Sequence, residues 1–556
     1  RTARVSVVHN WTALIGRSKL EFRNLFNQIG ENRTTIRTGR NLEEGFDVRN
    51  YSFRWQQRTI YSGQLHGSHD LPSGKDRLGW TLGFSRAWNK EPDLRRVRTM
   101  RDIDQSESND PYQIVIPPGA STLDAARFHS DMNGSGTTAR ADHEHTFDLP
   151  SEQVVLKLRG GVFAERKDRT FAARWMSFTR ANISTFDQSL VFLPLDQAFA
   201  PQNINSTTGF ELEEGTNPSD RYTASNSLLA GYLGTSLSWR SKFTASGGVR
   251  VEQNIQELSS ASFGGDRIEV NNPVTSVLPS ANVSWNYSDR SLLRAAWSRT
   301  VNRPEFRELA PFAFYDFSFN NVLYGNEKLV QASIDGVDMR WETYRGTSES
   351  MSLGVFYKQF TDPIETFFVP GTGSGGTRNF TFGNAAGATS VGLEAEVKRS
   401  LASVIDRPGT ARWGVIANAC WTHSSVDLGE SAVGQERERP MMGQSPYVVN
   451  GGIYFDDAAQ RVRLSALYNV SGRRLFAVGT FGTPDIYEMP RHMVDLSASI
   501  GWGDHLEVKC GVQDLLNAPV LLQQDSDANG RIDDGDERIL SYHRGSSINL
   551  ALSYVF

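Results

Sequence analysis

Residues 548–556 read INLALSYVF, and this ending determines how the rest of the chain is interpreted. Apolar side chains recur there at every second position: Ile548, Leu550, Leu552, Tyr554 and Phe556. The residues between them are smaller and mostly polar, except Val555. A strand with one apolar face, one polar face and an aromatic end suits the wall of a membrane barrel. A soluble β-sandwich has the same alternation, so the remaining sequence must distinguish the two.

The composition favours the membrane barrel. The mean hydropathy is −0.42, and the sequence contains no transmembrane helix because no run of about 18 apolar residues occurs. Even so, glycine (49 residues), tryptophan (12 residues) and aromatic residues in general (11%) are abundant. Only alternate residues of a barrel strand face lipid, which reconciles low hydropathy with many aromatic residues. The net charge of −5 is dispersed and gives no support for nucleic acid as a partner.

The two-residue period recurs along the whole chain. VRLSALYNV (462–470), MSLGVFYK (351–358) and VGLEAEVK (391–398) each place apolar residues on one face and polar or charged residues on the other. Counting such segments predicts an all-β protein with about 19 strands. The charges predicted to face inward line the lumen or contact a plug: Arg159, Glu394, Glu396, Lys398, Arg461, Arg463, Glu507 and Lys509.

The connections between these strands alternate in length. Short polar turns alternate with long irregular segments at 94–136, 181–221, 305–331, 367–387, 428–444 and 519–544. Short turns on one side and long loops on the other are typical of an outer-membrane barrel. So many long loops would be unusual in a compact soluble domain.

Tryptophans and cysteines agree with a barrel wall. Seven tryptophans lie near predicted short turns, where an aromatic girdle is expected at one membrane interface: Trp11, Trp80, Trp239, Trp285, Trp341, Trp413 and Trp502. The two cysteines, Cys420 and Cys510, fall on different strands and opposite faces. We therefore expect them to be unpaired.

The strand count bears on the topology. A single-chain bacterial barrel has an even number of strands and both chain ends in the periplasm. With 19 strands and the last one running towards the periplasm, the first strand also runs inward. The sequence therefore predicts that residues 1–556 are one transmembrane antiparallel up-and-down β-barrel domain. They would belong to a barrel of about 22 strands whose N-terminal plug and first strands are absent from this sequence.

The segment LPSANVSWNYSDRSLLRAAWSRTVNRPEFRELAPFAFYDF (278–317) resembles the TonB-dependent receptor family, in the large-barrel form of Bacteroidetes-type bacteria. YGNEKL (324–329), residues 9–39 and GVQDLLNAPV (511–520) are also similar to family members. The resemblance implies a location in the bacterial outer membrane, with lipid as a partner. It further implies import of a scarce nutrient (a siderophore, vitamin, glycan or peptide). That import would be driven by an inner-membrane energy-transducing complex acting through the plug.

Two other functions stay open at this stage. One is a passive porin-like channel, and the other is a structural or secretion-associated barrel whose loops bind partner proteins such as a surface lipoprotein. The sequence shows no Ser/His/Asp or Cys/His nucleophile signature, so we expect neither an enzyme nor catalytic residues. The aromatic residues of PEFRELAPFAFYDF (304–317) either floor a ligand site or pack the loop.

One loop has the pattern of a calcium site. DSDANGRIDDGD (525–536) places oxygen ligands at positions 1, 3, 5, 7, 9 and 12: Asp525, Asp527, Asn529, the carbonyl of Arg531, Asp533 and Asp536. Gly530 stands at position 6, where the loop turns sharply. Position 12 is Asp rather than the usual Glu, and no flanking helices are evident. The sequence predicts a structural Ca²⁺ site in an extracellular loop, and the alternative is an acidic hairpin tip.

Overall fold

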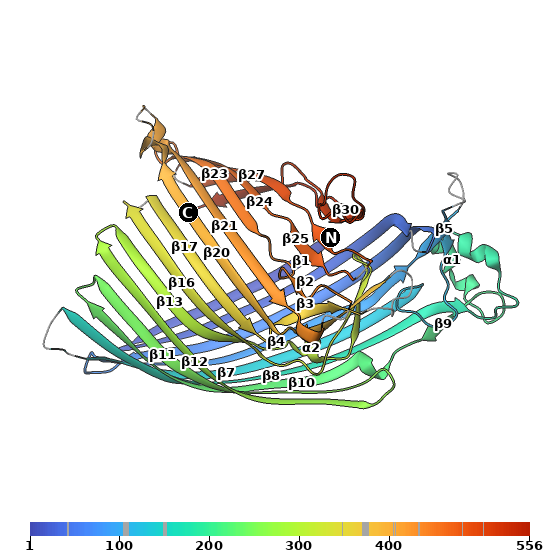
Figure 1. Cartoon of the computed structure of the whole chain (residues 1–556), viewed down its shortest axis with the longest axis horizontal. Coiled ribbons are helices and arrows are strands. Elements are labelled where there is room, and N and C mark those ends of the chain that lie inside the picture. Colours follow the sequence, from blue (N-terminus) through green and yellow to red (C-terminus); the bar gives the residue numbers. More distant parts are fainter. Residues whose placement is uncertain are drawn as a thin grey trace.

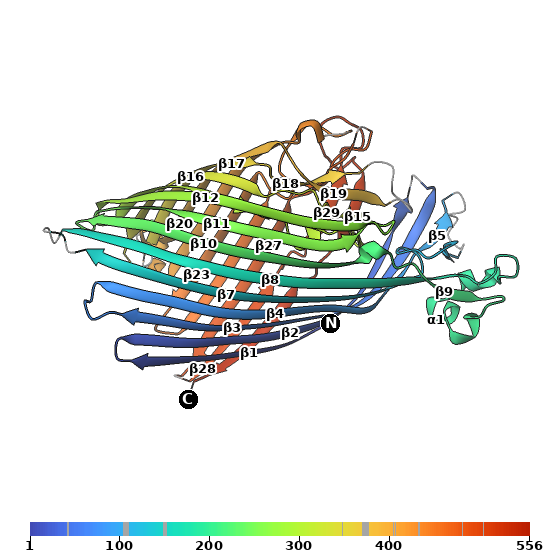
Figure 2. The ribbon, with the colours of Figure 1, turned by 90° about the horizontal axis from the view of Figure 1, so that it is seen from below.

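The computed structural model describes the whole chain except residues 42–43, 104–110, 148, 150–152, 347–348, 370–376, 404, 406, 408, 432–433, 481, 504 and 556. Phe556, the last residue of the predicted C-terminal apolar face, therefore lies outside the described residues. Figure 1 shows a single large curved sheet with loops and small sheets gathered at one end. Figure 2 shows the same sheet from below, with the N-terminal strands in front and the C-terminal strands behind.

In the described part of the chain, 19 strands follow one another and each pairs antiparallel with the next. They are β1 (Thr2–Ile15), β2 (Ser18–Asn41), β3 (Phe46–Asp70), β4 (Asp76–Val97), β7 (Ala126–Phe147), β8 (Val154–Arg180), β10 (Arg221–Trp239), β11 (Phe243–Ala261), β12 (Arg267–Ser288), β13 (Ser291–Asn302), β16 (Ala332–Arg345), β17 (Glu349–Thr361), β20 (Gly387–Ser400), β21 (Trp413–Asp427), β23 (Tyr447–Asp457), β24 (Val462–Ser471), β27 (Arg491–Trp502), β28 (Leu506–Gln513) and β31 (Ser547–Tyr554). The predicted all-β, up-and-down arrangement and the count of about 19 strands are confirmed.

The remaining elements belong to the connections. Four short strands extend the large sheet at its long-loop end: β5 (Thr99–Asp102), β6 (Gln113–Ile114), β9 (Phe210–Glu214) and β22 (Glu438–Arg439). One four-stranded sheet, sheet B, contains β14 (Ala313–Asp316), β15 (Asn321–Tyr324), β18 (Ile364–Phe368) and β19 (Arg378–Asn384). A second, sheet C, contains β25 (Arg474–Ala477), β26 (Ile486–Glu488), β29 (Val520–Gln524) and β30 (Arg538–Tyr542).

Helices are few and short. They are α1 (Leu195–Ala198), α2 (Phe306–Leu309) and the 3₁₀ turns η1 (Gln188–Phe192), η2 (Pro201–Asn203), η3 (Pro218–Asp220), η4 (Leu401–Ser403), η5 (Thr410–Arg412) and η6 (Gly429–Ser431). Across the described ranges, none of them is long and apolar enough to cross a membrane.

The pairing registers separate an outer from an inner face. Ile548, Leu550 and Leu552 of β31 stand opposite Val512, Cys510 and Val508 of β28, and the three β31 residues are 69–77% exposed. When the registers are followed from strand to strand, the seven turn-proximal tryptophans all fall on this same face. An exposed apolar face with a tryptophan belt is the expected lipid-facing surface.

The outer face carries a second tryptophan level as well. Trp88 follows Trp80 on β4, and Trp421 follows Trp413 on β21, in each case eight positions along one face. Eight residues span about 26 Å of strand at roughly 3.3 Å per residue, which is comparable with the apolar band of an outer-membrane barrel. The two levels therefore mark both edges of the lipid-facing band.

The two halves of the wall differ in height. The strands of the tall half, β2–β4, β7, β8 and β10–β12, contain 19–27 residues each. Those of the low half, from β13 to β31, contain 8–15 residues. About 9–11 residues suffice to cross a membrane, so the tall half extends well beyond the lipid-facing band at the long-loop end.

Two connections differ from the sequence-based expectation. The loop expected at 94–136 is shorter, because β4 runs to Val97 and β7 already begins at Ala126. Residues 126–136 lack apolar alternation because their outer face lies above the band and meets water, whereas on the inner face Phe128 packs against a connection. Conversely, residues 472–490 form a long connection that is not among the predicted long segments, and they carry β25 and β26.

The apolar core lies in the connections rather than in the wall. Buried side chains form six clusters, and these join loop residues to the long-loop ends of the strands. The cysteines behave as predicted, since both are free. Cys420 pairs in register with the inward Glu394, whereas Cys510 lies on the outer face.

Candidate functional site

The long-loop end is crossed by one connection that we call the strap, residues 303–331 between β13 and β16. It carries α2, β14 and β15. Its first part packs Phe306 and Leu309 against Tyr222 of β10 and Leu258 of β11. Registers place these wall residues on the inner face. The strap therefore lies inside the wall.

The strap then continues across the inner face of the tall half. Phe312 packs against Leu94 of β4, Phe128 of β7 and Ala173 of β8. Its ring centroid lies 4.9 Å from that of Phe171. The strap thus begins at β13 of the low half and is anchored on β4, β7 and β8 of the tall half.

Polar contacts fasten the strap along the same path. Gln256 Nε2 of β11 donates to the carbonyl of Pro304 (2.8 Å), and Arg303 pairs with Glu252 of β11. At the other end, Arg37 of β2 donates to the carbonyl of Phe317 (2.6 Å) and to Asn320 (3.0 Å).

Four arginines lie over four aromatic rings of the strap. The guanidinium carbons are 5.2 Å (Arg37 over Phe317), 4.9 Å (Arg96 over Tyr315), 5.2 Å (Arg169 over Phe306) and 4.1 Å (Arg307 over Phe314) from the ring centroids. Phe306, Phe312, Tyr315 and Phe317 are at most 8% exposed. Of the two roles considered for these aromatic residues, the structure shows the packing one. Arg307 belongs to the strap itself, and the other three cationic partners come from β2, β4 and β8, which sequence reasoning had not connected to the strap.

The strap contributes β14 and β15 to sheet B, and sheet C packs against sheet B. Phe380 of β19, Leu475 of β25, Ile486 of β26 and Leu522 of β29 share one buried cluster, and Leu323 of β15 packs against it. Three long connections of the low half thus join the strap in a loop assembly at the mouth of the wall.

A buried ion pair joins sheet B to β22 of the large sheet. Arg439 of β22 lies 3.0 Å from Glu365 of β18, with side chains 3% and 11% exposed. Arg439 also donates to the carbonyl of Thr366 (3.1 Å). Burial raises the pKa of Glu365, and the nearby Arg439 opposes that rise.

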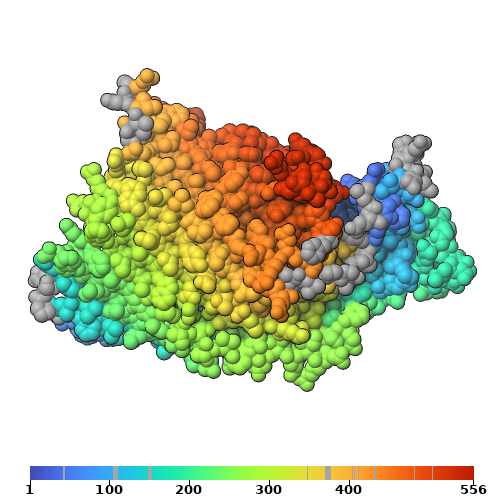
Figure 3. Space-filling model, viewed as in Figure 1, coloured from blue at the N-terminus to red at the C-terminus, as the bar shows by residue number. Residues whose placement is uncertain are grey.

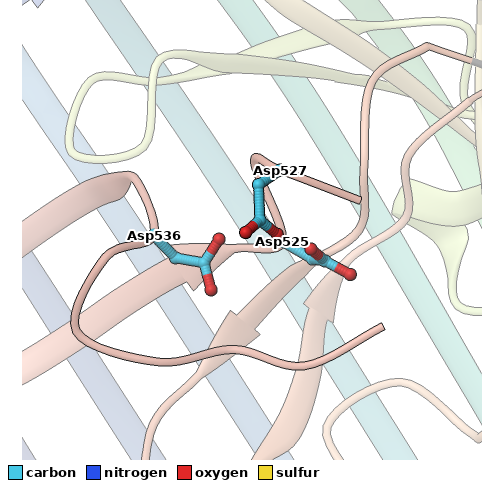
Figure 4. Close-up of side chains that lie close together, drawn as sticks. All are labelled: Asp525, Asp527 and Asp536. Atoms are coloured by element: carbon cyan, nitrogen blue, oxygen red, sulfur yellow. The ribbon is translucent and has the colours of Figure 1, made fainter. Parts of the chain in front are cut away.

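The predicted calcium loop connects β29 to β30 of sheet C, at the surface of the molecule (Figure 3, red). Figure 4 shows the carboxylates of Asp525, Asp527 and Asp536 gathered in one turn of this loop. One oxygen from each lies within 4.8 Å of the others. The structure thus brings together positions 1, 3 and 12 of the predicted site.

Backbone N–H groups preorganise these carboxylates. Asp525 accepts from Gly530 N (2.7 Å) and Asn529 N (3.1 Å), and Gly530 has a φ of +80°. Asp536 accepts from the N–H groups of Ser526 (2.9 Å) and Asp533 (2.8 Å). These N–H donors hold the pKa of Asp536 below its usual range.

The other three predicted ligands are not in that carboxylate group. The Oδ1 atom of Asp533 accepts from Gly535 N (2.8 Å), and Oδ1 of Asn529 accepts from Arg531 N (2.8 Å). Within the part of the chain that the structure describes, the Arg531 carbonyl accepts no hydrogen bond. A cation at this position would therefore be held by Asp525, Asp527 and Asp536.

The inner wall below the loop assembly is polar and of mixed charge. Registers place the predicted lumen residues of the strands on the inner face: Arg159, Glu394, Glu396, Lys398, Arg463, Glu507 and Lys509. Arg461 lies in the β23–β24 turn, with a φ of +54°. Several of these charges pair within the wall, as Arg159 does with Glu144 and Lys509 does with Glu507 (3.1 Å).

The chain was compared with known proteins. A family profile described as "TonB dependent receptor-like, beta-barrel" matches residues 17–515. No curated protein matches the chain. Among solved structures, the chain is similar to the Ferric-Catecholate import receptor Fiu of E. coli K12 in its closed form (12% identity, TM-score 0.55, covering 100% of this chain and 81% of Fiu).

Two further solved structures are similar at the same level. They are the copper transporter OprC (12% identity, TM-score 0.59, covering 100% of this chain and 80% of OprC) and BauA, the ferric preacinetobactin receptor of Acinetobacter baumannii (11% identity, TM-score 0.57, covering 100% of this chain and 78% of BauA). At these identities the likeness concerns the fold.

Proposed function

The chain belongs to the TonB-dependent receptor β-barrel family of the bacterial outer membrane, and we propose that it captures a scarce nutrient at its extracellular loops and imports it by energy-coupled plug remodelling. The long-loop end is then extracellular and the short-turn end periplasmic. The observation that carries the proposal is the loop assembly of strap, sheet B and sheet C at the mouth of the wall. It provides a structured vestibule in which a ligand can be held before transport. The ligand would be a siderophore, vitamin, glycan or peptide.

Energy-coupled import requires a closed barrel and a plug in addition to this wall of strands. Among the described pairings, none joins β1 to β31. Each of these two strands therefore has one edge without a strand neighbour. An open edge in lipid costs several kcal/mol per unpaired polar group. We infer that further strands complete a barrel of about 22 strands, and that a plug within it engages the inner-membrane energy-transducing complex.

Growth on defined nutrients tests the import proposal. A strain in which the gene is deleted should fail to grow on the limiting nutrient, and the intact gene should restore growth. Restoration should disappear when the proton-motive force is collapsed or the inner-membrane energy-transducing complex is removed. Growth rescue that survives both treatments would contradict energy-coupled import.

A passive channel is the main alternative, and conductance separates it from import. The intact receptor with its plug should be almost silent in planar bilayers, because the plug fills the lumen. A steady open-channel conductance of the intact protein would favour a porin. A silent protein that imports no nutrient would favour a structural barrel whose loops bind a partner such as a surface lipoprotein.

We also propose that the β29–β30 loop binds Ca²⁺ as a structural cofactor. The preorganised carboxylates of Asp525, Asp527 and Asp536 support this. Hard oxygen ligands in a flexible loop favour Ca²⁺ over transition metals. The ion would stiffen the tip of sheet C, which packs against sheet B.

A further inference from the structure

A small cavity lies at the end of the strap, where Gln331 meets β11 and β12 of the wall. Its volume is about 170 Å³. One proline, two valines and five carboxamide side chains line it, and the carboxamides belong to Asn254, Gln256, Asn271, Asn272 and Gln331. Sites for a complete drug-sized ligand measure about 300–1,000 Å³. The cavity therefore has room for one polar group of a ligand rather than for a whole nutrient.

Two of these carboxamides have an oxygen without a partner. In the part of the chain that the structure describes, Asn254 Oδ1 and Gln331 Oε1 are buried and accept no hydrogen bond. Asn254 as a whole is only 2% exposed. An unpaired buried acceptor is unfavourable, and folded proteins pair the great majority of such atoms. These two oxygens therefore favour a ligand that brings hydrogen-bond donors into the cavity.

Two of the other carboxamides hold the wall and the strap together around the cavity. Gln256 Nε2 donates to the carbonyl of Pro304 at the start of the strap (2.8 Å). Asn272 Nδ2 donates to the carbonyl of Leu329 near its end (3.4 Å). Both amides thus use an N–H group on the strap backbone, and the cavity keeps its shape without a ligand.

The end of the strap is fixed as well. Gln331 Nε2 donates to Ser276 Oγ of β12 (2.9 Å). The Asn384 side chain accepts from Val330 N (2.9 Å) and donates to the Val330 carbonyl (3.0 Å). Val330 is nevertheless 49% exposed, so solvent reaches the edge of the cavity. A ligand group that enters would meet a preorganised set of amides.

The chemistry of the lining selects a neutral group. Among the described residues, no charged side chain lines the cavity. Glu252, two positions from Asn254 along the same face of β11, already pairs with Arg250 (2.6 Å) and with Arg303. An ion buried here would lack a counter-charge, which is costly. A hydroxyl group both donates and accepts, as a carboxamide does, and therefore matches the lining without any charge.

We propose that this carboxamide cavity is a subsite for a neutral, hydroxyl-bearing group of the imported nutrient, namely a sugar ring. This inference rests on the proposed function and deepens it, since it favours a glycan among the nutrients considered. The competing explanation is that the cavity holds only structural water between strap and wall. In that case the stability of the strap, but not sugar binding, would respond to replacement of the amides.

Saturation-transfer NMR on the intact receptor distinguishes the two, in a detergent that carries no sugar. The probes are the methyl glycosides of glucose, galactose, mannose and xylose, and at least one of them should bind saturably. Tetrahydropyran, the same ring without hydroxyl groups, should bind at least tenfold more weakly. A site whose buried polar groups would stay unpaired rejects a ligand that lacks the matching donors.

Replacement of single amides locates the binding. Asn254→Leu keeps a side chain of similar size without the carboxamide, and Gln331→Met does the same at the second unpaired oxygen. Each should weaken binding of the glycoside at least tenfold. Asn282→Leu is the matched control, because Asn282 lies lower on the inner face of β12 and its oxygen already accepts from Ser246 Oγ (2.8 Å).

Thermal unfolding and hydrogen exchange over residues 305–331 are followed in the same variants. Asn254→Leu should leave the melting midpoint unchanged or raise it, because it removes an unpaired buried polar group. Weaker sugar binding with undiminished stability supports the proposal. It is overturned if none of the four glycosides binds, if tetrahydropyran binds equally well, or if both variants bind as the unmodified receptor does. A lower midpoint with a detached strap in both variants assigns the amides to the fold and overturns it too.

The outcome is separable from that of the proposed function. If the receptor imports its nutrient but Asn254→Leu and Gln331→Met bind and import normally, the sugar subsite is wrong and the import function stands. If sugar binding depends on both amides while no energy-coupled import occurs, the subsite stands and the import function is wrong.

Discussion

At the scale of single residues, Arg439 shows how the loop assembly depends on one buried charge. Its replacement by Ala would leave Glu365 buried without a counter-charge, which costs about 3–5 kcal/mol. We expect faster hydrogen exchange in β18 and β19 of the variant. Arg437→Ala is the control, because Arg437 is 70% exposed in its pair with Asp427 and such pairs contribute at most about 1 kcal/mol. Equal exchange in both variants would contradict this.

The pH dependence of the Arg439→Ala variant follows from Glu365. Burial raises the pKa of this carboxyl in the folded state, so the protonated, uncharged form is the one that the fold tolerates. The fold is then most stable below the unfolded pKa and loses stability as the pH rises through the folded pKa. We expect hydrogen exchange in β18 and β19 to be slower at pH 5 than at pH 8 once the intrinsic rate is corrected.

Ca²⁺ binding by the β29–β30 loop can be tested by replacing a single carboxylate side chain. Calorimetry should detect Ca²⁺ binding with a Kd of about 10⁻⁴–10⁻³ M, typical of extracellular modules. Asp525→Ala should weaken it at least tenfold, and Asp534→Ala, at an exposed position outside the carboxylate group, should not. If the unmodified protein does not bind Ca²⁺, the proposal that Ca²⁺ is a structural cofactor is wrong.

Binding of Ca²⁺ should also survive moderate acid. Because the backbone N–H groups of Ser526 and Asp533 hold the pKa of Asp536 down, this carboxylate stays ionised below the ordinary Asp pKa of about 3.9. Affinity should therefore be similar at pH 8 and pH 5 and fall only at lower pH. A loss centred near pH 6 would point to a different set of ligands.

At the scale of elements, the strap is a local unit whose docking depends on Phe312. Phe312→Ala removes a side chain that is 7% exposed, and such truncations cost about 3–5 kcal/mol. The strap should detach while the wall stays folded. Residues 305–331 should then exchange much faster with deuterium, whereas Phe263→Ala, at a position 76% exposed, should change nothing.

The C-terminal strand tests which face meets lipid. Leu550→Arg places a charge on the outer face of β31, at a cost of about 2–4 kcal/mol near the middle of the membrane. Asn549→Arg places the same charge on the inner face and should cost far less. Urea unfolding in lipid vesicles measures both. Equal destabilisation would mean that the faces are assigned the wrong way round.

The strands also show what the sequence can predict. Lipid requires an apolar residue at every second outward position, so β31, β24 and β17 were recognised from their alternation. Residues 126–136 of β7 were missed because His129, Asp131 and Asn133 face outward above the lipid-facing band, where nothing enforces an apolar residue. Turn-proximal tryptophans fixed the outward face correctly.

The course of the strap could not be predicted. It depends on contacts between residues far apart in the chain, such as Arg37 and Phe317, which are separated by 280 positions. The calcium loop lies between these cases. Its spacing is local and therefore readable, and the fold gathers the carboxylates of Asp525, Asp527 and Asp536, with Asn529 hydrogen-bonded to Asp527.

At the scale of the whole molecule, the two halves of the wall differ in height. We therefore expect ligand capture to depend on which side of the mouth is obstructed. A small folded tag inserted after Gly443, in a connection of the low half, should slow ligand uptake several-fold at low ligand concentration. The same tag after Gly265, at the β11–β12 tip of the tall half, should not. Competitive uptake of labelled nutrient would measure both. Equal slowing by the two tags would rule out a directional entrance.

The unequal height of the wall has a consequence for encounters at the cell surface. A rim of uniform height admits a diffusing molecule mainly from above. Here the strands of the low half end lower and their connections carry sheets B and C, while the strap lines the inner face of the tall half on the opposite side. A molecule travelling parallel to the cell surface that passes over the low rim meets this barrier and is turned back across the vestibule. The effective capture cross-section is thereby larger than the opening of the barrel and is oriented along the surface.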